Sequence, residues 1–116
     1  MGDGAWVKEL KVGITVCDRD GTALEMNDRA AETFAADGGR DLVGKSILDC
    51  HPPRARALFE ELLRTGGTNA YTIEKNGVKK LVYQAPWTVD GEYRGIVELS
   101  LPIPFEMPHF VRKSEG

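Results

Sequence analysis

The sequence predicts an α+β domain in which helices pack on one face of a five-stranded antiparallel sheet. Three observations lead to this fold class. The chain begins with two short strand-like runs around a turn, continues through helical stretches, and closes with three longer strand-like runs. A leading hairpin and a closing three-stranded meander can share one antiparallel sheet, while the helical middle covers one of its faces.

The first hairpin is predicted over residues 12–26. Every second residue of its first run is apolar, which is the period of a half-buried strand; these residues are Val12, Ile14 and Val16. Asp20-Gly21 supplies the turn, because glycine adopts positive φ and aspartate bonds nearby backbone. We expect Leu24 and Met26 to share one face of the second run.

Asn27 follows this hairpin and precedes the Ala-rich stretch 29–34. A short polar side chain at that position can accept a hydrogen bond from an unpaired backbone N–H of the first helical turn. We therefore predict that the Asn27 side chain ties the second strand to a helix.

The longest helix begins at Pro52-Pro53 and ends before Gly66-Gly67, as proline and glycine favour at the two helix ends. Its apolar residues recur at helical spacing and form one face: Ala55, Leu58, Phe59, Leu62 and Leu63. Before it, residues 42–48 are predicted to cross the open face of the sheet in short helical turns.

Three strands complete the sheet, over residues 70–75, 78–87 and 95–101. Asn76-Gly77 joins the first two and is the strongest short hairpin signal. The pattern Gly-Ile-x-Val-x-Asp-x-Asp-Gly-x-x-Leu-x-x-Asn, from Gly13 to Asn27, resembles the start of a PAS domain. The resemblance extends from about residue 10 to 103 and implies a PAS fold with strand order 2-1-5-4-3.

We divide the chain into an N-terminal cap segment (1–11), the PAS domain (12–103) and a proline-containing extended tail (104–116). Prolines in the tail exclude a long helix, and its apolar residues are expected to wrap over the domain or to form a docking strip for a partner. One core cannot cover all the apolar side chains at the two ends of the chain, which are Trp6, Val7 and Leu10 in the cap and Phe105, Met107 and Phe110 in the tail. We therefore predict a homodimer through the cap and the outer face of the sheet.

Composition excludes several classes of protein. The 116 residues suit one domain, and a net charge of −3 with scattered Lys and Arg gives no basic patch for nucleic acid. No apolar run reaches membrane-spanning length, and the N-terminus lacks the layout of a signal peptide, so we expect a cytoplasmic protein with no membrane partner. Cys17 and Cys50 are expected to be free thiols.

The space between sheet and helices is the candidate ligand pocket. Its predicted lining, which simple core packing would explain equally well, is Ile14, Val16, Leu24, Phe34, Leu48, Leu58, Leu62, Tyr83 and Val97. Tyr83 and Trp87 share one side of a strand and need polar partners if buried. Glu98, in a central strand, is expected to be exposed, and its burial would indicate a role.

Cys50-His51-Pro52-Pro53 resembles a branch of bacterial PAS domains, some of them joined to hemerythrin-like domains. Heme-binding PAS domains use a histidine near this helix as the axial ligand, so the resemblance implies His51 as the heme ligand if heme is bound. The competing interpretation is a structural histidine at the helix start.

Other chemistry is disfavoured. Flavin-binding relatives carry Asn-Cys-Arg-Phe after the glycine that corresponds to Gly44, where this chain has Ser-Ile-Leu-Asp. No spacing of Cys and His predicts a metal site, and Cys50 beside His51 is the sole nucleophile–base candidate, so no catalytic residue is assigned and no enzyme is expected.

Two functions remain. The first is a sensory or regulatory module that binds a small, mostly apolar ligand or cofactor of unknown identity and signals through dimer or partner contacts. The second is a ligand-free protein–protein interaction module, with a heme-binding gas or redox sensor as a further alternative.

Overall fold

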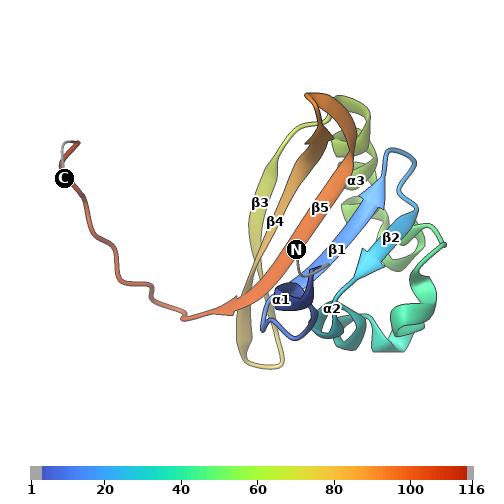
Figure 1. Cartoon of the computed structure of the whole chain (residues 1–116). Helices are drawn as coiled ribbons and strands as arrows, with labels where there is room; N and C mark the ends of the chain where they lie inside the picture. The colour runs from blue at the N-terminus through green and yellow to red at the C-terminus, as the bar shows by residue number, and fades with distance from the viewer. Residues whose placement is uncertain (1–3, 115–116) are drawn as a thin grey trace.

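A computed structural model describes residues 4–114 and contains the predicted five-stranded sheet. Its strands are β1 (Gly13–Asp18), β2 (Ala23–Met26), β3 (Asn69–Lys75), β4 (Val78–Val89) and β5 (Glu92–Ile103). Their order is β2-β1-β5-β4-β3, and every neighbouring pair is antiparallel (Figure 1). The predicted fold class and strand order are confirmed.

Within residues 4–114, three α-helices and three 3₁₀ turns accompany the sheet. The helices are α1 (Ala5–Lys8), α2 (Asp28–Thr33) and α3 (Pro53–Thr65), and the turns are η1 (Ala35–Asp37), η2 (Gly39–Leu42) and η3 (Ile47–Cys50). α3 starts and stops as predicted, because Gly66 adopts φ 66° and donates its N–H to Leu62 O.

The core lies between the sheet and α3. Cys17 and Ile96 from the sheet meet Phe59, Leu62 and Leu63 from α3. Since alternate residues of a strand point to opposite faces, these contacts define an inner face, toward α3, and an outer face.

The predicted facing of the first hairpin is wrong. Gly13, Thr15 and Cys17 are buried, so Ile14 and Val16 point to the outer face. Both faces of β1 carry apolar or small residues, and alternation alone does not distinguish them.

The turns agree with their sequence signals. Asp18 Oδ1 accepts the backbone N–H groups of Asp20 and Thr22 at 2.9 and 3.0 Å. Asn76 and Gly77 adopt φ 53° and 78° between β3 and β4, as a two-residue hairpin requires.

The two ends of the chain carry exposed apolar side chains. Trp6 is 71% exposed and Phe110 73%, and the residues after β5 run away from the domain (Figure 1). The expectation that the tail wraps over its own domain is therefore wrong for the residues described. Residues 1–3 of the cap and 115–116 of the tail lie outside the described range.

No helix within residues 4–114 is long and apolar enough to cross a membrane.

Candidate functional site

A cleft of about 660 Å³ opens between the inner face and the segment that leads into α3. Its sheet side is formed by β3, β4 and β5, with Tyr71, Val82 and Glu98 among the lining residues. Its helical side is formed by Phe34, Cys50, His51, Pro52 and Ala55. A groove of about 350 Å³ adjoins this inner-face cleft along α3 and shares Pro52, Ala55 and Tyr71 with it.

A row of polar side chains crosses the inner face. Asn69 Nδ2 donates to Gln84 Oε1 at 3.3 Å, and Gln84 Nε2 donates to Glu98 Oε1 at 2.6 Å. β-Sheet register places Gln84 opposite Glu98, and Glu98 opposite the buried Thr15. The expectation that Glu98 is exposed is wrong, because only 8% of it is accessible.

His51 lies at the start of α3 and lines the cleft. Its Nδ1 is 2.8 Å from Ile47 O, and its ring stacks on Phe59 with centroids 5.5 Å apart. A neutral His51 therefore donates from Nδ1, and no hydrogen bond to Nε2 occurs within residues 4–114.

Burial shifts the pKa of one ionisable group in the core and of two that line the cleft. It raises the pKa of Cys17 to about 11 and also raises the pKa of Cys50, with the charges of Asp37 and Asp49 adding to the effect at Cys50. The pKa of Tyr71 is raised first by burial and then by the negative charge of Glu98. Both cysteines are free thiols, as predicted.

The sequence pattern of the PAS fold family matches residues 7–103. The chain belongs to the PAS family.

Solved structures agree with this assignment at the level of the fold. A C-terminal domain from Streptococcus mutans is 24% identical in sequence, with a TM-score of 0.64 over 84% of this chain and 79% of that one. The PAS domain of BvgS from Bordetella pertussis is 22% identical, with a TM-score of 0.63 over 85% of this chain and 82% of that one. The Aer2 receptor from Vibrio cholerae, described as a dual PAS-heme oxygen sensor, is 18% identical, with a TM-score of 0.59 over 80% of this chain and 95% of that one. No curated protein sequence matches the chain.

Among the nine predicted pocket residues, only Phe34 lines the cleft of this PAS domain. Leu58 is 59% exposed and lines the adjoining groove, while Leu48 and Leu62 pack in the core. Tyr83 and Val97 lie on the outer face, since they pair with the outward residues of β5 and β1. Leu24 is exposed because the β1–β2 register shifts between Val16 and Cys17.

Trp87 was predicted to share one side of its strand with Tyr83 and to need a polar partner if buried. It lies on the same side of β4 as Tyr83, as predicted, and its indole Nε1 donates to Cys17 O at 3.0 Å. This bond supplies the polar partner that a half-buried tryptophan needs.

Sequence analysis missed the polar row of the inner face. The available signal was that Thr15, Gln84 and Glu98 each interrupt an apolar strand. Polar residues at matching depth in three adjacent strands indicate the side that faces a cleft, because a packed core would penalise them.

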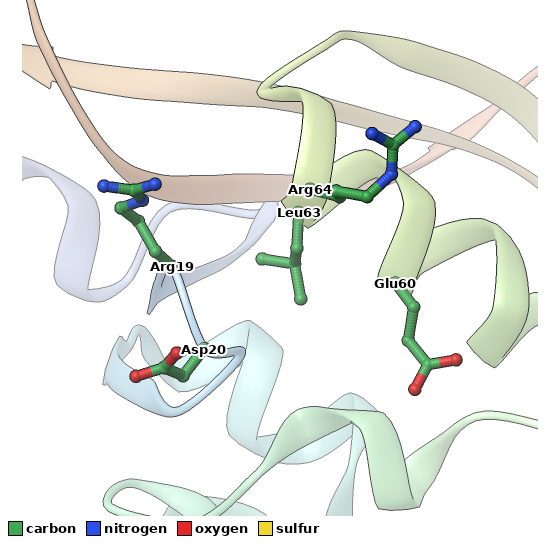
Figure 2. Close-up of a pocket in the computed structure, with 5 residues that line it drawn as sticks. All are labelled: Arg19, Asp20, Glu60, Leu63 and Arg64. Atoms are coloured by element: carbon green, nitrogen blue, oxygen red, sulfur yellow. The ribbon is translucent and has the colours of Figure 1, made fainter.

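A second hollow lies between the β1–β2 turn and α3. Figure 2 shows Arg19 and Arg64 on opposite sides of Leu63, with their guanidinium groups far apart. Arg64 pairs with Glu61, and Arg19 lies over the Tyr93 ring at 5.3 Å. These charges already have partners, so the inner-face cleft is the better candidate site.

Proposed function

We propose that this PAS domain is a sensory or regulatory module that binds a small, mostly apolar ligand in the inner-face cleft. The observation that carries the proposal is the cleft of about 660 Å³ in the position where a filled core would leave no such space. Its volume falls in the range of small-molecule sites, and a few polar groups among apolar walls are typical of them.

β5 offers a route for the signal. Glu98 faces the cleft, while its neighbours Val97 and Leu99 face outward, opposite Val16 and Ile14 of β1. A ligand that shifts Glu98 therefore acts on the strand that carries the outer face. We propose that this face contacts a second copy or a partner protein.

Mass spectrometry of freshly purified protein tests the proposal. Native spectra should show a species heavier than the denatured chain by the mass of a small molecule. The variant Ala55→Trp, which places a large side chain in the cleft, should lose that added mass, whereas the exposed Leu58→Ala should keep it. A wild type with no added mass, together with a structure whose cleft has closed, would support the ligand-free interaction module.

Heme is a second candidate because of the geometry at His51. Histidines that bind metals commonly donate their other ring N–H to a carbonyl, as Nδ1 does here to Ile47 O, which leaves Nε2 for iron. The Aer2 receptor, whose fold is similar, is described as a dual PAS-heme oxygen sensor. Hemin titration of wild type and of His51→Ala tests this candidate. A Soret shift in the wild type alone would identify His51 as the heme ligand, and no shift in the wild type would show that the domain does not bind heme.

We also propose that the domain is not an enzyme. Burial raises the pKa of Cys50, which disfavours the thiolate, and His51 directs Nδ1 to Ile47 O. The neighbouring pair is thus poorly arranged for nucleophilic catalysis. A cytoplasmic location remains part of the proposal, because two free thiols suit a reducing compartment.

A further inference from the structure

Glu98 is a buried carboxylate without a cation. No Lys, Arg or His nitrogen of residues 4–114 lies within 4.0 Å of it, since none of the ion pairs in that range includes Glu98. Its one side-chain hydrogen bond there comes from Gln84. A carboxylate can accept about four hydrogen bonds, so most of its capacity is unused by these residues.

The second carboxylate oxygen of Glu98 retains some accessible surface. In the part of the chain that the structure describes, no fully buried side-chain oxygen or nitrogen lacks a hydrogen-bond partner. Oε2 has no such partner there, so it must be accessible, and the accessible space that Glu98 lines is the cleft. Gln84 therefore holds Oε1 of Glu98, while Oε2 is available to a ligand in the cleft.

The other charged groups of the cleft do not neutralise Glu98. Lys80 lies on β4 four residues before Gln84, the residue opposite Glu98, and four residues of strand span about 13 Å. Lys75 lies at the same far end, beside the β3–β4 turn. Tyr71 is closer, because it pairs with Val82, two residues from Gln84 on β4. Burial first and then the negative charge of Glu98 raise the pKa of Tyr71.

We infer that the ligand carries a protonated amine on an apolar body, and that the Glu98 carboxylate binds this amine. The inference rests on the proposed function of the cleft. An ammonium group would pair with an anion that is otherwise buried alone, through a short charge-assisted hydrogen bond. The apolar body then lies against Val82 and Phe34, and Tyr71 adds an aromatic ring to the wall of the same cleft.

Three probes with the same ring and similar size separate the effect of charge from that of shape: cyclohexylmethylamine, cyclohexylmethanol and cyclohexanecarboxylate. Titrations followed by backbone amide chemical shifts give each dissociation constant. We expect wild type to bind the amine at least about tenfold more tightly than the alcohol, with the carboxylate weakest. Amide shifts should centre on Glu98 and Tyr71.

The variant Glu98→Gln should remove the preference for the amine over the alcohol. Glu25→Gln, which changes an exposed carboxylate outside the cleft, should keep the preference. Should Glu98→Gln fail to fold, the wild-type affinity ratio and the positions of the shifted amides decide by themselves.

Equal affinity for amine and alcohol, or a preference that survives Glu98→Gln, would overturn the inference and leave the cleft as a binding site for neutral ligands. Failure of all three probes to bind wild type would also overturn it. The proposed function is judged separately, by the mass that freshly purified protein carries.

Discussion

Asn27 joins four parts of the chain through one side chain. Its Oδ1 accepts from Ile14 N at 2.9 Å and Ala30 N at 3.0 Å, and its Nδ2 donates to Val7 O at 2.9 Å and Val12 O at 2.7 Å. The predicted link between the second strand and the following helix is confirmed, and it extends to α1 and β1.

Asn27→Ala should lower the free energy of unfolding by about 2–3 kcal/mol, because it removes a helix cap and leaves buried backbone groups unpaired. Urea unfolding measures the loss. Asn27→Asp keeps the acceptor oxygen but loses both donors, so it should fall between wild type and Asn27→Ala. A loss below about 0.5 kcal/mol for Asn27→Ala would contradict this role.

Cys17 should make stability fall at alkaline pH. Its pKa rises on folding from about 9 to about 11, chiefly through burial. The unfolded chain therefore loses the thiol proton at a lower pH than the folded protein does. The contribution of Cys17 to the free energy of unfolding is complete below pH 9 and is lost as the pH rises toward 11.

Urea unfolding of wild type and Cys17→Ala at pH 7 and near pH 11 isolates the effect of Cys17. The other groups titrate in both proteins, so their effects cancel in the difference. The advantage of wild type should shrink by about 2 kcal/mol between the two conditions. A constant difference would show that the Cys17 pKa is not raised by folding.

The roles of single residues could be predicted from the sequence where they depend on neighbours a few positions away. The cap at Asn27 and the turn at Asp18 depend on side chains that bond backbone a few residues away. The burial of Glu98 depends on Gln84, which is 14 residues distant on another strand, and no local pattern contains that pairing.

At the level of elements, the apolar face of α3 predicts the burial of most but not all of its residues. Phe59, Leu62 and Leu63 are buried as expected, but Leu58 is 59% exposed beside the groove. The helix contacts the sheet along a narrower strip than its apolar face.

Leu62→Ala is therefore expected to cost about 2–5 kcal/mol, as the truncation of a core residue does. Leu58→Ala on the same helix is the control and should cost less than about 0.5 kcal/mol. Both values follow from urea unfolding, and similar losses in the two variants would mean that α3 packs differently.

The strands were predictable, but which way they face was not. Turns such as Asn76-Gly77 mark where strands end. β1, however, alternates Ile14 and Val16 with Thr15 and Cys17, and only its pairing with β5 shows which set meets α3. This one-residue difference accounts for four of the eight errors in the predicted pocket lining, namely Ile14, Val16, Tyr83 and Val97.

At the level of the whole molecule, exposed apolar groups indicate association. Trp6 is 71% exposed, and Tyr83 is exposed on the outer face. We predict a homodimer through the outer face and the N-terminal segment, which sedimentation at micromolar concentration measures.

Tyr83→Arg should shift the protein to monomer, because it places a charge in the centre of that interface, while Leu58→Ala should not. A wild type that sediments as a strict monomer would contradict the predicted dimer.

The central claim is that the inner-face cleft holds a small molecule. The most direct measurement is a crystal structure of freshly purified protein, never exposed to denaturant, at a resolution that reveals ordered ligands. Our account predicts density for a compact molecule between Tyr71, Val82 and Glu98. A cleft closed by side chains, or one that contains only water, would contradict it.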